Sequence, residues 1–70
     1  MGVVIYTKPG CQYCAAAIDD LVDRGVEYEE IDVTTAPGGQ DRLAELTFGS
    51  MMVPVIVEED GSVHVAAGGG

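Results

Sequence analysis

The junction between the first apolar run and the first helical pattern constrains the fold of this chain most strongly. Residues 3–6 are apolar and mostly β-branched, and Lys8-Pro9-Gly10 follows them, which predicts a buried strand that ends in a turn. A helical pattern then begins with Cys11-Gln12-Tyr13-Cys14, which holds the only two cysteines of the sequence. Gly25 ends this pattern, whose apolar residues recur at helical spacing: Ala17, Ile18, Leu21 and Val22.

Hydrophobic periodicity and turn residues predict four further elements. With the first strand and helix, they give the order β-α-β-α-β-β. Asp60-Gly61 between the last two strands is a strong hairpin signal, so these strands should pair antiparallel. The first two strands should run parallel through a right-handed helical crossover. We therefore expect an α/β fold with a mixed four-stranded sheet and helices on both faces, in a single domain over residues 1–70. The further elements cover residues 26–33 (strand), 40–48 (helix), 54–58 (strand) and 63–66 (strand).

The alternation of apolar and polar residues does not decide which residues of the second strand face the core. Val26 and Tyr28 compete with Ile31 or Val33 for the inner face, and Glu29-Glu30 lies between them, so the register stays open there.

Later in the chain, three large apolar side chains should fill gaps in the core or line a groove. They are Phe48, Met51 and Met52. His64 alternates with valines on the last strand, so its side chain should face solvent.

The charge of the sequence excludes two classes of partner. The formal net charge is −9, with three cationic side chains, Lys8, Arg24 and Arg42. Such a surface repels nucleic acid and anionic lipid, so we expect no nucleic acid and no membrane as partners. It favours solubility, and it would also suit a partner protein with a basic patch. The chain has no membrane-length apolar run and its N-terminus lacks a signal-peptide pattern, so we expect a cytoplasmic location.

In a reducing compartment, two close cysteines are more often catalytic or metal-binding than a structural disulfide. A bridge across so short a loop would also add little stability, since the loop-closure entropy grows with loop length. The pair is therefore a candidate reactive site.

The positions of the two cysteines predict different roles. Cys11 lies where the backbone N–H groups of the first helical turn are unpaired. These dipoles and the nearby Lys8 should lower the pKa of its thiol from about 8.5 into the range of roughly 3.5–7.5. Cys14 lies one turn further along, on the apolar side of the helix, where desolvation disfavours its thiolate. Cys11 would then attack a substrate disulfide, and Cys14 would resolve the mixed disulfide that results.

In combination, these residues resemble the glutaredoxin branch of the thioredoxin-like superfamily. A CxxC pair alone is a weak signal, whereas a CxxC pair followed about forty residues later by Val-Pro at the start of a strand is specific. The resemblance implies a thioredoxin-like fold of glutaredoxin type. It also implies an enzyme that reduces protein disulfides or glutathione mixed disulfides, with glutathione as a co-substrate. The likeness runs through residues 3–14, Gly25-Val26-Glu27-Tyr28, Ile31-Asp32-Val33, Gln40-Asp41-Arg42-Leu43 and Val53-Pro54-Val55-Ile56.

The same resemblance implies which residues surround the cysteines. A cis peptide bond is implied between Val53 and Pro54, in a turn that faces the cysteines and offers backbone groups to the substrate. Lys8 and Arg42 suit contact with glutathione chemically, because glutathione is anionic. The residues expected to contact substrate or glutathione are Lys8, Tyr13, Gln40, Arg42, Met52, Val53, Pro54, Gly68 and Gly69.

Two departures from the family pattern lead to further expectations. The family's double glycine is matched by Gly68-Gly69, but the acidic residue and the final helix that usually follow are missing. Part of one sheet face would then be uncovered, so we expect self-association as a homodimer. Gln12 stands where the common dithiol members have proline. Some members without that proline bridge an iron–sulfur cluster between two subunits.

Two functions stay open beside the oxidoreductase. One is a glutathione-assisted module that binds an iron–sulfur cluster. The other is a copper or zinc carrier of the ferredoxin-like kind, which also places CxxC before a helix and uses sulfur ligands suited to Cu(I). Pro9 stands where such carriers usually have methionine, and the hairpin at Asp60-Gly61 does not fit their element order, so we expect no metal. The electron donor is also open between glutathione and a flavoenzyme reductase.

Overall fold

The elements follow one another in the predicted order. The computed structural model describes residues 2–50 and 52–65. The second and third strands are each shorter than predicted, and the second helix begins and ends one residue earlier. Residue 66, which we expected in the last strand, lies outside the described residues. The elements are β1 (Val3–Thr7), α1 (Gln12–Asp23), β2 (Tyr28–Asp32), α2 (Gly39–Thr47), β3 (Val55–Val57) and β4 (Val63–Val65).

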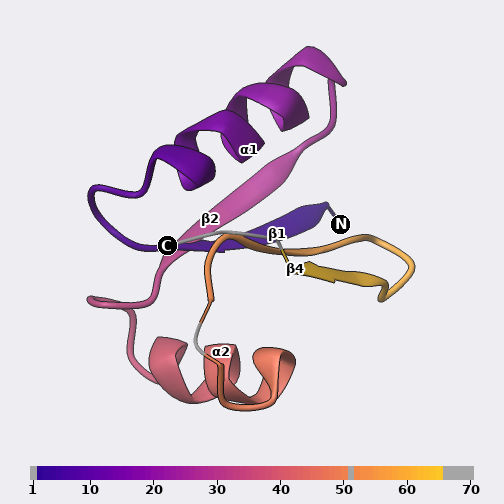
Figure 1. Cartoon of the computed structure of the whole chain (residues 1–70). Helices are drawn as coiled ribbons and strands as arrows, with labels where there is room; N and C mark the ends of the chain where they lie inside the picture. The colour runs from indigo at the N-terminus through magenta and orange to yellow at the C-terminus, as the bar shows by residue number, and fades with distance from the viewer. Residues whose placement is uncertain (1, 51, 66–70) are drawn as a thin grey trace.

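The four strands form one mixed sheet in the order β2-β1-β3-β4. β1 pairs parallel with β2, whereas β3 pairs antiparallel with β1 and with β4. α1 lies over one face of the sheet and α2 over the other, as Figure 1 shows. The predicted α/β architecture, with helices on both faces and a hairpin at the end, is confirmed.

Two clusters of buried side chains join the helices to the sheet, because β1 alternates between its faces. On the α1 side, Val3 and Ile5 pack against Leu21. Ile5 and Leu21 are both fully buried, and burial of a side chain of this size contributes roughly 1.5–3 kcal/mol. The cluster on the other side comprises Tyr6, Cys14, Val33, Leu43, Val53 and Val55.

The pairing of β1 with β2 settles the register that the sequence left open. Ile5 stands beside Glu30, and Tyr6 stands beside Ile31. Ile31 is half-buried and packs against the cluster on the α2 side. Glu30 shares the α1 face with Ile5, because neighbours in register on adjacent strands point to the same face.

Two apolar side chains are exposed, which contradicts the inward position expected for Val22 and the core-filling option for Phe48. Val22 is 58% exposed, because Leu21 takes the inward position and the next residue on a helix is turned by about 100°. Phe48 is 98% exposed. It ends α2 in a left-handed conformation with φ 55°, which turns its side chain away from the inner face of the helix.

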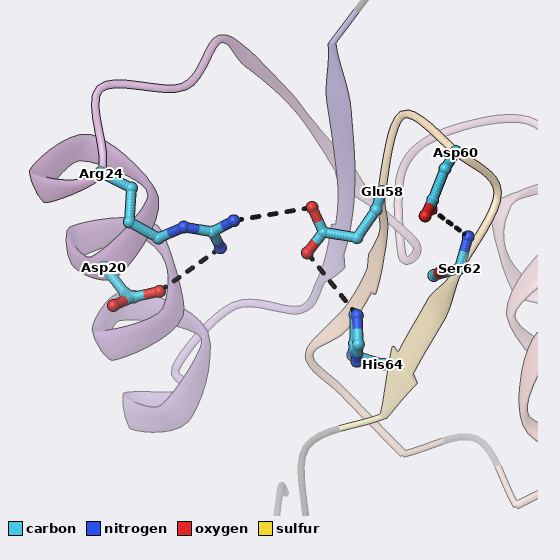
Figure 2. Close-up of polar contacts among 6 residues, drawn as sticks. All are labelled: Asp20, Arg24, Glu58, Asp60, Ser62 and His64. Atoms are coloured by element: carbon cyan, nitrogen blue, oxygen red, sulfur yellow. Dashed lines mark hydrogen bonds and ion pairs between the residues drawn. The ribbon is translucent and has the colours of Figure 1, made fainter.

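Polar contacts connect the C-terminal end of α1 to the β3–β4 hairpin, as Figure 2 shows. Arg24 Nη1 lies 3.7 Å from Asp20 Oδ2, and Arg24 Nη2 lies 3.7 Å from Glu58 Oε1. The other carboxylate oxygen of Glu58, Oε2, lies 3.7 Å from His64 Nε2. The Arg24 side chain is about half exposed, so each of its ion pairs is worth less than about 1 kcal/mol. The exposed position of His64 agrees with the prediction. This network lies at the opposite end of α1 from the cysteines.

Candidate active site

The loop between β1 and α1 places both cysteines at the start of the helix. Thr7 ends the strand, and Gly10 turns the chain with φ 78°, a conformation that glycine adopts without strain. Cys11 is the N-cap of α1, with extended backbone angles (φ −89°, ψ 111°). The strand–turn–helix context predicted for the cysteine pair is therefore present.

The sulfur of Cys11 takes the place of the oxygen that usually caps a helix. The backbone N–H of Cys14 donates a hydrogen bond to Cys11 Sγ at 3.2 Å. At this position serine, threonine or aspartate would normally accept the same bond. Cys11 is half-buried, and its sulfur lies at the positive end of the helix dipole, where negative charge is stabilised.

The second cysteine is buried and holds its proton. Cys14 is 4% exposed, and neither cysteine forms a disulfide. Burial is the largest of the causes that raise the pKa of the Cys14 thiol to about 11, followed by a hydrogen bond with the Cys11 side chain. A backbone hydrogen bond from Lys8 opposes these effects, whereas the negative charges of Cys11 and Glu30 add to them. A protonated Cys14 can donate its S–H to Cys11, which favours a thiolate there.

The Val53-Pro54 turn lies beside the cysteines. The peptide bond between these two residues is cis, as the resemblance implied. Val53 is fully buried and shares a core cluster with Cys14, and Cys11 packs against the same cluster. The turn and the cysteine loop are therefore parts of one packed unit, although they are far apart in the sequence.

A depression of about 380 Å³ opens at the cysteines. Lys8 lines it together with Cys11 and Cys14, so the structure brings this predicted cation to the site. Glu30 of β2 also lines it, and its carboxylate accepts a hydrogen bond from Thr7 Oγ1 at 2.9 Å. Glu30 could not be predicted as a site residue, because the face on which it lies depends on the register of β2, which the alternation of apolar and polar residues left open.

Arg42 lies on α2, on the other side of the sheet from this depression. Interaction with the Tyr6 side chain is the main reason why the pKa of Arg42 is raised. Arg42 donates to Glu45 at 3.3 Å. Since Tyr6 shares the core cluster with Cys14, Arg42 is connected to the cysteine end of the sheet through one side chain.

The other predicted contact residues are spread around the site. Gln40 lines a separate depression of about 250 Å³ at the start of α2. Tyr13 is 54% exposed, and Met52 is half-buried next to the Val53-Pro54 turn. Gly68 and Gly69 lie outside the described residues. Their roles in binding stay predictions.

Two features, a metal-ligand cluster and a membrane-spanning helix, are absent from the described residues. Residues 2–50 and 52–65 contain no group of three or more histidine, cysteine or acidic side chains arranged to hold a metal ion. No helix in that part of the chain is both long and apolar enough to cross a bilayer.

This chain is similar in sequence to a known protein family and to two curated relatives. A family model described as Glutaredoxin matches residues 3–63. The Gene 56 protein of Mycobacterium phage L5 is 33% identical over 57 residues, which are 81% of this chain and 54% of the relative. The Gene 56 protein of Mycobacterium phage D29 is 37% identical over 57 residues, which are 81% of this chain and 62% of the relative. This chain therefore spans less than two thirds of the length of either relative.

Solved structures with a similar fold include three glutaredoxins. The one from Archaeoglobus fulgidus has a TM-score of 0.76 at 24% identity, over 93% of this chain and 74% of that one. The wheat protein has a TM-score of 0.73 at 27% identity, over 91% of this chain and 61% of that one. The one from Brucella melitensis has a TM-score of 0.63 at 38% identity, over 79% of this chain and 59% of that one. These likenesses confirm the predicted thioredoxin-like fold of glutaredoxin type.

Proposed function

This chain belongs to the glutaredoxin family, whose model matches residues 3–63, and on that premise we propose that it is a thiol–disulfide oxidoreductase that acts through Cys11 and Cys14. One observation carries the proposal. The Cys11 sulfur caps a helix and accepts an N–H at 3.2 Å, while the Cys14 thiol is buried with a pKa of about 11. One sulfur is thus placed to be ionised, and the other is placed to keep its proton until it is needed.

The reaction has two exchange steps. The Cys11 thiolate attacks one sulfur of the substrate disulfide, a new S–S bond forms, and the other substrate sulfur leaves as a thiolate that takes a proton from water. Cys14 then loses its proton to water and attacks Cys11 Sγ. The mixed disulfide breaks, the second substrate thiol is released, and a Cys11–Cys14 disulfide remains. The substrate gains two electrons and the protein loses two.

The packing around the cysteines supports this order of steps. Half-buried Cys11 lines the open depression, so a substrate disulfide can reach it. Buried Cys14 is shielded from direct attack on substrates and lies one helical turn away, within reach of a mixed disulfide at Cys11. The cis Val53-Pro54 turn, packed against the same cluster, would hold the substrate backbone, as the family resemblance implies.

The substrates and the reductant belong to the same proposal. We propose protein disulfides or glutathione mixed disulfides as substrates, with glutathione or a flavoenzyme as the reductant, in the cytoplasm. Glutathione is anionic, and Lys8 in the cysteine depression is a suitable contact for one of its carboxylates. Arg42 would bind a second carboxylate from α2, where it interacts with the Tyr6 side chain. Homodimer formation stays a prediction.

Trapping of a mixed disulfide tests the proposal directly. The Cys14→Ser variant should form a stable adduct with a disulfide substrate at Cys11, because the resolving thiol is absent. The Cys11→Ser variant is the matched control and should form little adduct at neutral pH, because Cys14 stays protonated and buried. Mass spectrometry of the intact protein and of its peptides locates the adduct. Equal trapping at both cysteines, or tight Cu(I) binding with unreactive thiols, would contradict the proposal.

A further inference from the structure

The three cations of the chain lie in different surroundings, and within residues 2–50 and 52–65 one of them lines the cysteine depression. Arg24 is paired at the far end of α1 (Figure 2), and Arg42 is held on α2. Lys8 is the cation that lies beside Cys11. Among the described residues, Lys8 is therefore the cation that an anionic substrate meets within the depression itself, on a protein whose net charge is −9.

A carboxylate shares this depression with Lys8. Glu30 lies on β2 beside Ile5, on the face that α1 covers, so its side chain reaches the cysteine loop rather than the open edge of the sheet. The buried Thr7 hydroxyl donates to Glu30 Oε2 at 2.9 Å and fixes the position of the carboxylate. Among the described residues, no cation lies within ion-pair distance of Glu30, so the carboxylate is free to pair with a cation from outside.

We propose that the preferred substrates are disulfides of polypeptides that carry a lysine or arginine next to the oxidised cysteine, and that Glu30 binds this cation. The inference rests on the proposed function and names the substrate class of the same site. The sulfur chemistry is unchanged: Cys11 bonds to one substrate sulfur and the other leaves as a thiolate. The cation on the substrate meets Glu30 while its disulfide meets Cys11.

The charges of Lys8, of Glu30 and of the acidic protein surface favour cationic substrates over anionic ones. A substrate carboxylate that approaches Lys8 also approaches Glu30, so attraction and repulsion partly cancel. A substrate cation meets Glu30 at the site and is attracted by the whole acidic surface on the way there. A single partly exposed ion pair of this kind gives a preference of about five-fold.

Pairing with Glu30 should change binding more than the chemical step. The cation is bound both before and during the attack by Cys11, so its interaction stabilises the encounter complex and the transition state alike. Loss of the interaction should raise KM and leave kcat nearly unchanged. A merely structural defect at Glu30 would instead slow the reaction with every disulfide.

Matched peptides provide the test. We would use three synthetic peptides with one intrachain disulfide each, identical except for lysine, glutamine or glutamate after the first cysteine. Stopped-flow mixing of the reduced protein with a series of peptide concentrations, at pH 7 and low salt, gives KM and the limiting rate kcat for each peptide. Division by the rate with β-mercaptoethanol removes the intrinsic reactivity of the peptide. The variants are Glu30→Gln and, as the control, Glu29→Gln, which removes one exposed charge from the other face of the same strand.

The expected result for the natural protein is a preference of about five-fold for the lysine peptide over the glutamine peptide, which 0.5 M salt abolishes. Glu30→Gln should remove most of this preference through KM, whereas Glu29→Gln should retain both the preference and the rate with the glutamine peptide. Equal losses in both variants would assign the effect to overall charge and overturn the role of Glu30. Equal rates for all peptides with the natural protein would overturn the substrate preference and leave the oxidoreductase proposal intact. Failure of Cys11 to react with any peptide would overturn both.

Discussion

The backbone N–H of Cys14 donates to Cys11 Sγ at 3.2 Å, so the sulfur that we propose as the nucleophile also caps the helix that follows it. The contact connects helix stability with reactivity, because the same sulfur atom accepts the capping N–H and is placed to attack a disulfide. A substitution at Cys11 therefore has a structural effect that can be separated from its chemical effect.

The Cys11→Ser and Cys11→Ala variants should differ in stability, although both should lack activity. A serine oxygen can accept the N–H of Cys14, so Cys11→Ser should unfold at about the same urea concentration as the natural protein. Cys11→Ala leaves that N–H without its cap and should cost about 1 kcal/mol. Urea unfolding followed by circular dichroism measures the difference. Equal stability of the two variants would mean that the sulfur does not act as a cap.

The Cys14 thiol should make stability fall at alkaline pH. In the folded protein its pKa is about 11, whereas in the unfolded chain a thiol ionises near pH 8.5. Between these values the folded state binds more protons, so this contribution is fully present below about pH 8.5 and is lost as the pH rises toward 11. The full loss is about 3 kcal/mol, since each pKa unit corresponds to 1.36 kcal/mol. Urea unfolding under reducing conditions from pH 7.5 to 10.5 should show the decline.

The control for this pH effect is Cys14→Ala, measured at the same pH values. It retains every other titrating group, including the tyrosines, so the difference between the two proteins isolates the thiol. The stabilities of the natural protein and of the variant should converge as the pH rises. Parallel curves would show that the Cys14 thiol titrates alike in the folded and unfolded chains.

Neighbouring residues on α1 should respond very differently to truncation. Leu21 is fully buried between α1 and the sheet, so Leu21→Ala should cost about 2–5 kcal/mol. Val22 is 58% exposed, so Val22→Ala should change the free energy of unfolding by less than about 0.5 kcal/mol. Chemical denaturation of the two variants checks the prediction. A large cost at Val22 would contradict the observed orientation of the helix.

Phe48 should be a site where substitution stabilises the protein. Its φ of 55° is unfavourable for a bulky side chain, and 98% of its surface is exposed, so few contacts offset the strain. Phe48→Asn, which tolerates the left-handed conformation, should raise the free energy of unfolding by about 0.5–1 kcal/mol. Phe48→Leu is the control, because it also removes the ring but keeps the strain. Thermal unfolding should rank the asparagine variant above the other two proteins.

The two arginines offer a matched test of glutathione binding. Arg42→Ala should raise KM for a glutathione mixed disulfide about three- to five-fold, because the variant loses the charge, beside Tyr6, that we propose to bind a glutathione carboxylate. Arg24→Ala removes the same charge at the opposite end of α1, where the arginine pairs with Asp20 and Glu58. It should leave KM nearly unchanged. Similar effects of both substitutions would indicate long-range attraction instead of direct contact.

The sequence was sufficient to predict the elements and the reactive end of the molecule, because local signals determine both. The turn at Lys8-Pro9-Gly10 and the apolar spacing after Cys14 place the cysteines at a helix start, and Asp60-Gly61 specifies the hairpin. Side-chain orientation was less predictable where apolar and polar residues do not alternate regularly. Glu30 reaches the site only because β1 pairs with β2 in one register, which depends on contacts between distant segments. Phe48 turns outward because the helix ends in a left-handed residue, a feature that apolar spacing does not reveal.

The place of β1 between β2 and β3 has a consequence for how such a protein can change over time. The backbone of β1 is paired on both sides, so the segment that leads into the cysteine loop is held independently of the residues exposed on the outer strands. Substitutions at exposed positions of the outer strands β2 and β4 can therefore change the surface of the protein while the loop that carries the two cysteines keeps its position.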